Sequence, residues 1–328
     1  MPPKPSCQEL KQEYSQLEVL KEKFLLAFKK AKKSGDPEEA KRLKKELEEK
    51  ITALREKLFV SIERAKEILG KDVLGPDEAA KLLNTTAPEL FKGKIPPIPF
   101  KTKDIEKAKE RGEMLVLRVK EDSEGNPLTM SRIEEMLQAR FTKEGKGKIL
   151  FDTNWYKNED FFIKDTPNLE WKLVSKDILP GSTNKNYIEQ TKLLREHLKS
   201  INALTPEEEE ECTDAKLQIL WDELGFNKKG DIADQSKYDA NWKRIAQILV
   251  NLKINQNHRR KAIESLYDTL LYFSANNERL LSSSYESTRT ISSGGILVHF
   301  GGFDSLGVSV SRWMPGIRFG DLGVSSSR

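Results

Sequence analysis

Residues 284–328 read SYESTRTISSGGILVHFGGFDSLGVSVSRWMPGIRFGDLGVSSSR, and their composition differs from that of the chain before them. Lysine does not occur after Lys261, whereas serine and glycine become frequent. The stretch also contains a near-repeat, because FDSLGVSVSR at residues 303–312 returns as FGDLGVSSSR at residues 319–328. We therefore treat this terminal segment as the region that the rest of the chain holds in place.

Both copies of the repeat alternate apolar and small polar residues, which is the period of a half-buried β-strand. In the first copy Leu306, Val308 and Val310 would share one face of the strand, and the serines between them the other. Residues 296–300 (ILVHF) predict a further strand, and residues 313–321 (WMPGIRFGD) predict a loop between the two copies. Short strands joined by glycine-rich loops predict a small antiparallel sheet that displays loops.

Several terminal motifs resemble the variable proteins of diversity-generating retroelements. They are GILVHFGGFD at residues 295–304, Trp313-x-Pro315, the Leu-Gly-Val that ends at Val324, and the final Ser-Arg328. The resemblance implies a C-type lectin fold of the subtype shared with formylglycine-generating enzyme. It also implies that template-directed, adenine-specific mutagenesis rewrites selected codons in a carboxyl-terminal variable region while the scaffold is kept. The likeness extends more weakly to residues 155–161 and 171–174, and an ordinary β-rich subdomain is the alternative.

The resemblance implies a ligand-binding surface on this variable region. Trp313, Leu322, Gly323 and Val324 would hold the scaffold. The expected contact residues are Tyr285, Ser287, Arg289, Phe303, Leu306, Val308, Val310, Arg312, Met314, Gly316, Ile317, Arg318, Phe319 and Asp321. Because Val308 and Val310 alternate with the serines of one strand, they cannot both be exposed while Leu306 is buried on the same face, so some of these residues must be core.

The residue types of the terminal stretch suit recognition. Tyrosine, arginine, phenylalanine and serine supply large rigid contacts, forked donors and adaptable hydroxyls. Serine, arginine, glycine, isoleucine, phenylalanine, valine and aspartate can all be reached from asparagine codons by changing adenines. Trp313 and Met314 cannot be reached in this way, which fits a scaffold role for Trp313 and leaves the assignment of Met314 open.

The composition indicates a soluble chain large enough for two domains. Among 328 residues 33% are charged, and the net charge of +4 is nearly balanced, so specific nucleic-acid binding is not expected. Cys7 and Cys212 are too far apart in sequence to suggest a disulfide framework or a metal site. With no signal-peptide core and no membrane-spanning run, we expect a cytoplasmic location, and display on a cell or virion surface stays open.

The amino-terminal part has a helical pattern. Apolar residues recur at three- and four-residue steps over residues 8–69, with a break at Ser34-Gly-Asp-Pro37. This pattern predicts an antiparallel helical hairpin or coiled coil, through which the protein could form homo-oligomers. The expected organisation is α+β: the hairpin at residues 1–70, a linking α/β segment at 71–140, and a C-type-lectin-like domain at 141–328.

The segments between hairpin and terminus alternate helical and strand patterns. Aromatic residues are dense over residues 151–175, which favours core packing. The expected helices span residues 102–111, 129–139, 183–198, 206–224, 238–252 and 259–273, and the expected strands span residues 114–119 and 148–151.

No arrangement of residues predicts catalysis. His197, His258 and His299 are scattered without metal-ligand spacing, and no nucleotide-binding or hydrolase motif occurs. The chain has no cysteine after Cys212, so the cysteine chemistry of formylglycine-generating enzyme is not carried over. Glu286, Asp304 and Asp321 are the acidic residues of residues 284–328, too few and too separated for a calcium-dependent lectin.

The sequence thus predicts a non-enzymatic, receptor-like protein that binds an unknown protein ligand and needs no cofactor or metal. The alternative is a structural or assembly protein that oligomerises through residues 8–69. A hydrolase or oxidase is a third class without a supporting constellation of residues.

Overall fold

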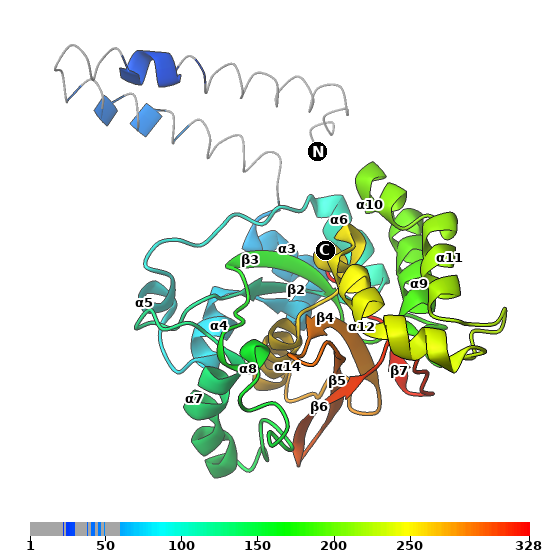
Figure 1. The fold of residues 1–328 in the computed structure, drawn as a ribbon. Coiled ribbons are helices and arrows are strands. Elements are labelled where there is room, and N and C mark those ends of the chain that lie inside the picture. Colours follow the sequence, from blue (N-terminus) through cyan, green and yellow to red (C-terminus); the bar gives the residue numbers. More distant parts are fainter. Residues whose placement is uncertain are drawn as a thin grey trace. The chain divides into compact units, whose positions relative to one another are not determined.

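The computed structural model describes residues 22, 24–29, 38, 41–42, 45–46, 49 and 60–328 (Figure 1). The hairpin expected over residues 8–69 falls mostly outside these described residues. One compact unit comprises residues 69–96 and 107–328 and carries the terminal stretch. It contains two small sheets and many helices, so the α+β class expected from the sequence is confirmed.

The elements follow one another with short connections. Their bounds are α3 (Ile62–Leu69), β1 (Val73–Leu74), α4 (Pro76–Leu82), α5 (Ala87–Phe91), α6 (Thr102–Glu110), β2 (Glu113–Arg118), α7 (Met130–Lys143), α8 (Asp160–Ile163), β3 (Glu170–Ser175), α9 (Tyr187–Ser200), α10 (Pro206–Glu211), α11 (Asp214–Glu223), α12 (Gln235–Asn251), α13 (Lys253–His258), α14 (Ala262–Asn276), β4 (Tyr285–Ile291), β5 (Leu297–Asp304), β6 (Gly307–Trp313) and β7 (Leu322–Gly323). Within the described ranges no helix has the length and apolar character needed to cross a membrane.

The first sheet has the order β1-β2-β3, with β1 parallel and β3 antiparallel to the central β2. Every residue of β2 is buried, as its run of apolar residues predicts. The end of the chain lies along β3, where Leu173 and Arg328 exchange backbone hydrogen bonds of 2.9 and 3.0 Å. The sequence placed a domain boundary between residues 140 and 141. Strand β2 lies before this boundary and β3 after it, so one sheet contains residues from both sides.

The second sheet has the order β6-β5-β4-β7 and is built from the terminal stretch. Strands β4, β5 and β6 are antiparallel, and β7 runs parallel to β4. A two-residue turn of Ser305 and Leu306 joins β5 to β6 between the paired Asp304 and Gly307. The first copy of the repeat therefore forms most of β6, whereas the second contributes only β7 before the chain joins β3.

Helix α14 packs against strands of both sheets (Figure 1). Residues 262–273 are buried on every side, the polar residues of the helix as well as the apolar ones. The ring of Phe273 meets that of Phe303 edge to face, with centroids 5.2 Å apart. This helix is the common support of the two sheets.

Buried charged residues tie α14 and its preceding turn to the strands. Arg118 donates to both carboxylate oxygens of Asp268 at 3.0 and 2.6 Å, and Arg260 donates to Glu286 at 2.7 Å. Arg118 also reaches the hydroxyl of Ser327 at 3.2 Å, and Arg260 that of Ser325 at 3.1 Å. These ion pairs fix the last residues of the chain in the interior.

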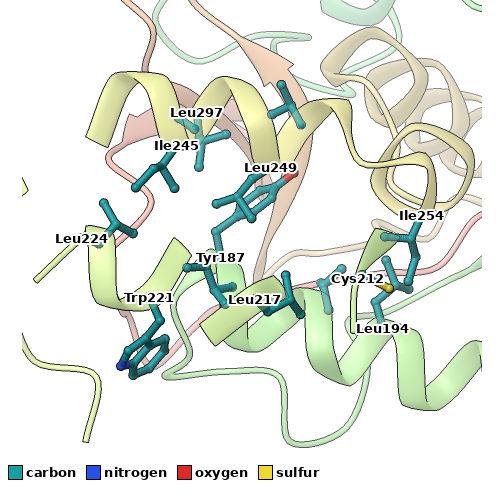
Figure 2. Packing of buried hydrophobic residues seen from close by; sticks show 14 of the residues in the cluster. Tyr187, Leu194, Cys212, Leu217, Trp221, Leu224, Ile245, Leu249, Ile254 and Leu297 are labelled. Carbon is teal, nitrogen blue, oxygen red and sulfur yellow. The ribbon is translucent and has the colours of Figure 1, made fainter. Parts of the chain in front are cut away.

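A second core gathers helices α9, α11, α12 and α13 against strand β5 (Figure 2). Trp221, Leu217 and Tyr187 pack there with Leu249 and with Leu297 of β5.

These helices differ in part from the sequence prediction. The single helix expected over residues 206–224 is interrupted, because Thr213 accepts a hydrogen bond from the Lys216 amide and starts α11 anew. The helix expected over 259–273 begins at Ala262, after the separate α13.

Candidate ligand-binding pocket

A pocket of about 230 Å³ opens on one face of the four-stranded sheet. Its lining residues are Tyr285, Ser309, Ser311, Trp313, Phe319, Asp321 and Leu322. The strand register places alternate residues on this face: Tyr285 and Ser309 both pair with Gly301, and Tyr285 also pairs with Leu322. All the lining residues belong to the terminal stretch, and each of the strands β4, β6 and β7 supplies at least one.

Gly301 of β5, which pairs with Tyr285 and Ser309, lets the backbone of β4 approach closely beside the pocket. A Cβ atom at this position would lie 2.1 Å from the carbonyl oxygen of Ser284 and 2.6 Å from the Cα of Tyr285, so no other residue fits without moving β4. The flanking residues of β6 on this face, Ser309 and Ser311, are small. These two small side chains leave room above β6.

Two exposed aromatic rings form one wall of the pocket. The centroids of Trp313 and Phe319 are 4.8 Å apart, with 41% and 36% of each residue exposed. Trp313 ends β6, whereas Phe319 belongs to the loop that follows it. Side chains of this size are rarely left in solvent as an adjacent pair unless they serve recognition.

The loop that carries Phe319 is held by contacts outside the pocket. The carbonyl oxygen of Phe319 accepts a hydrogen bond from the Asn184 amide at 2.7 Å. Arg318 forms an ion pair of 2.9 Å with Glu189, whose other oxygen caps the start of α9 through the Asn186 amide. Arg318 also donates to the carbonyl oxygen of Lys229 at 2.8 Å. The loop is therefore fixed, while the ring of Phe319 is partly exposed beside Trp313.

The polar groups of the pocket are unused. The hydroxyl groups of Tyr285, Ser309 and Ser311 make no hydrogen bond with any residue that the structure describes, and the carboxylate of Asp321 makes no ion pair or hydrogen bond there. Only the backbone carbonyl of Asp321 is engaged, by the Tyr285 amide at 2.7 Å. These four side chains can pair with a ligand without breaking a contact of the fold.

A buried histidine of β5 lies on the same face of the sheet, next to the pocket. His299 pairs with Ser311 on one side and Ser287 on the other, and 3% of it is exposed. Neither ring nitrogen has a hydrogen-bond partner within the described residues. Burial, followed by the charge of Arg259, lowers the pKa of His299 to about 3. The backbone of Trp313 would raise this pKa, but neither ring nitrogen forms a hydrogen bond with it. The imidazole ring of His299 is therefore neutral at physiological pH.

Arg259 is a buried cation that pairs with no carboxylate among the described residues. It donates to side-chain oxygens of Asn255 at 2.8 Å and Gln190 at 3.3 Å, and to the carbonyl oxygen of Ser287 at 3.2 Å. Its guanidinium carbon also lies 3.8 Å from the centre of the Tyr187 ring. Burial lowers the pKa of Arg259. Its role is structural, because these acceptors belong to α9, α13 and β4.

The structure brings three of the expected contact residues together in the pocket, namely Tyr285, Phe319 and Asp321. Leu306, at the tip of the β5–β6 turn, and Arg312 are exposed outside it. Arg312 faces away from the pocket, because its guanidinium carbon lies 4.7 Å from the centre of the Trp155 ring.

Four expected contact residues are buried and cannot meet a ligand: Ser287, Phe303, Val308 and Val310. Phe303 turns inward onto Phe273 because the register of β5 shifts between Gly301 and Asp304. Val308 pairs with Leu150, which lies in the segment expected as a strand at 148–151 and seen here as an isolated bridge. The expectation of exposure was wrong at these positions, and for Val308 and Val310 the reason is that this face of β6 is covered.

The remaining expected residues are half-buried and support the fold. Met314 packs against the second core, and Ile317 is half-buried in the same loop. Arg289 donates to Glu264 at 3.0 Å. A Cβ at Gly316 would lie 2.8 Å from a ring carbon of Tyr238, so that glycine cannot carry a displayed side chain. Arg318, as described above, binds Glu189.

Sequence reasoning missed four lining residues: Ser309, Ser311, Trp313 and Leu322. Trp313 and Leu322 were expected to serve the scaffold. The two serines could have been found, because strand alternation places them opposite the buried Val308 and Val310.

No metal site is evident among the described residues, which contain no cluster of three or more histidine, cysteine, aspartate or glutamate side chains. Cys212 is buried, and its thiol donates to the carbonyl oxygen of Glu208 at 2.9 Å. Burial raises the pKa of this thiol to about 11, so it is protonated near neutral pH.

Comparison with known proteins found no match, whether among family models, curated proteins or solved structures.

Proposed function

We propose that this chain is a non-enzymatic, ligand-binding variable protein of a diversity-generating retroelement, with a C-type-lectin-like domain that presents the terminal pocket to a protein partner. The observation that carries the proposal is the pocket itself. It is lined only by residues of the stretch 285–322, on the sheet face opposite Val308 and Val310. The motifs at residues 295–304, 313–315 and 322–328 supply the family resemblance.

The proposed role needs side chains that can change without loss of the fold. The hydroxyl and carboxylate groups of Tyr285, Ser309, Ser311 and Asp321 make no contact that the fold depends on, and substitutions at such positions usually cost little stability. Beneath them Gly301 and the ion pair of Arg260 with Glu286 hold the backbone. The division between presented groups and buried support is the property that codon diversification requires.

The codons of the pocket fit adenine-directed change. Tyrosine, serine, phenylalanine, aspartate and leucine are all encoded by triplets that differ from AAC or AAT only where an adenine stood. Trp313 is the one lining residue for which this does not hold. Trp313 is therefore expected to be constant, as is Leu322 of the scaffold, while the other lining side chains differ.

Sequencing of the gene and its neighbourhood tests the proposal. We expect a near-identical copy of the 3′ coding region beside a reverse transcriptase gene, differing only at adenines. Sister copies of the gene should differ at Tyr285, Ser309, Ser311, Phe319 and Asp321. The buried positions Phe303, Val308 and Val310, and the packed Gly316, should be constant in the same copies. Differences spread evenly along the gene would contradict the proposal.

A further inference from the structure

We propose that the pocket, with the residues it has in this chain, binds an organic cation on an alkyl stem, namely the ammonium or guanidinium group of a lysine or arginine side chain on the partner. This inference rests on the proposed function and deepens it by naming the chemistry that the pocket recognises. Three features carry it: aromatic walls, one unpaired carboxylate, and a size suited to a single side chain.

The aromatic walls come from three segments that the fold brings together. Tyr285 begins β4, Trp313 ends β6, and Phe319 lies in the loop between β6 and β7. The face of an aromatic ring attracts a cation, most strongly for tryptophan, and cages of such rings recognise alkylated ammonium groups. The apolar edges of the same rings suit the methylene stem of lysine or arginine.

The charge of the lining favours a cation. Asp321 is the only lining residue with a charge at neutral pH, and it is exposed without an ion-pair partner in the described part of the chain. The neighbouring cations are already engaged, because Arg318 pairs with Glu189 and Arg312 lies over Trp155 on the other face. His299, buried on the same face of the sheet, is neutral, and the charge of Arg259 is shared among several oxygen acceptors.

The hydrogen-bonding groups of the pocket match donors rather than acceptors. A carboxylate only accepts, and hydroxyl groups accept readily, whereas lysine and arginine side chains only donate. Asp321, Ser309, Ser311 and Tyr285 therefore offer acceptors with no partner in the described residues. A neutral apolar side chain would leave these groups without partners in the complex, at a cost in affinity.

The volume fits one side chain. About 230 Å³ is less than the roughly 300 to 1,000 Å³ of pockets that enclose drug-sized molecules. It exceeds the volume of several waters, each about 30 Å³ in the liquid. An extended peptide or an oligosaccharide would not fit inside, but a side chain projecting from a folded partner would.

Calorimetric titration of the full chain with three capped amino acids tests the inference. The probes are N-acetyl-arginine amide, N-acetyl-lysine amide and the neutral N-acetyl-norleucine amide. We expect at least one cationic probe to bind with a Kd on the order of 1 mM, and the neutral probe to bind at least about tenfold more weakly. Comparison of the two cationic probes distinguishes guanidinium from ammonium recognition. Added salt should weaken the cationic probes only.

Two variants localise the binding. Asp321→Asn should weaken the cationic probes about tenfold and leave the melting temperature unchanged, since its carboxylate contacts no described residue. Asp304→Asn is the matched control, because Asp304 is an exposed carboxylate of the same sheet outside the pocket, and it should change nothing.

Equal binding of the norleucine probe, absence of binding by both cationic probes, or an unchanged affinity in Asp321→Asn would overturn the inference. None of these results bears on whether sister genes differ at the pocket positions. If the copies differ there and the cations do not bind, only the cation inference fails.

Discussion

Arg260 holds the Glu286 carboxylate through two hydrogen bonds, of 3.2 and 2.7 Å, directly behind the strand that carries Tyr285 into the pocket. Both side chains are nearly inaccessible to solvent. Tyr285 and Glu286 are neighbours in β4, so they project to opposite faces of the sheet. The pocket face and the buried ion pair are therefore linked by a single peptide unit.

Removing Glu286 should destabilise the fold. Among the described residues, Glu286→Ala leaves the buried Arg260 with Asp268 alone, at 3.3 Å, to balance its charge. We expect the free energy of unfolding to fall by roughly 3 kcal/mol, the scale for breaking a buried ion pair from one side. Chemical denaturation measures it. Lys164→Ala is the control, because it removes an exposed ion pair with Asp160 and should change stability by less than about 0.5 kcal/mol.

The two phenylalanines that begin the copies of the repeat should respond oppositely to truncation. Phe303 is fully buried against Phe273, so Phe303→Ala should cost about 3–5 kcal/mol of stability. Phe319 is 36% exposed and packs mainly on Trp313, so Phe319→Ala should cost about 1 kcal/mol. Thermal unfolding compares the two. A similar loss in both variants would show that Phe319 supports the fold rather than the pocket.

The contrast between these phenylalanines shows how far the sequence leads. Alternation correctly separates Ser309 and Ser311 from Val308 and Val310, because a regular strand turns successive side chains to opposite faces. It fails at Phe303, where a shift in strand register after the Gly301-Gly302 pair turns the ring inward. The loop around Phe319 is not set by periodicity either, but by its contacts with α9 and α12.

Buried charges are the other feature that sequence reasoning could not reach. Arg118, Arg259 and Arg260 resemble the surface arginines of any charged chain, and each is almost completely enclosed. Their burial depends on partners such as Asp268, distant in sequence by up to 150 residues. Ion pairs of this kind depend on the tertiary fold, so a local sequence pattern cannot predict them.

Gly301 should tolerate no side chain. Gly301→Ala places a methyl group 2.1 Å from the carbonyl oxygen of Ser284, so β4 must move away from β5. We expect a loss of at least about 2 kcal/mol, as for overpacked cores, together with loss of ligand binding. Gly320→Ala is the matched control, since a Cβ there meets no atom within 4 Å. Equal denaturation midpoints for the two variants would contradict the role given to Gly301.

The buried His299 should make stability depend on pH. Its pKa is about 3 in the folded chain and near 6.5 when exposed, so below pH 6.5 the unfolded state binds a proton that the folded state does not. The free energy of unfolding should therefore fall with decreasing pH, by up to about 1.4 kcal/mol for each unit between pH 6.5 and 3. Burial lowers the pKa of His258 and His197 too, and their contributions have the same sign.

The variant His299→Leu isolates this contribution, because it removes the titrating ring and leaves the other histidines in place. Denaturant unfolding of both proteins at pH 7.5, 6.5, 5.5 and 4.5 gives two stability curves. Their difference should be constant above pH 6.5 and should change in favour of the variant as the pH falls, since only the wild-type chain must keep this ring neutral in the folded state. Parallel curves over the whole range would mean that His299 is protonated equally in the folded and unfolded states, contrary to its burial in the folded chain.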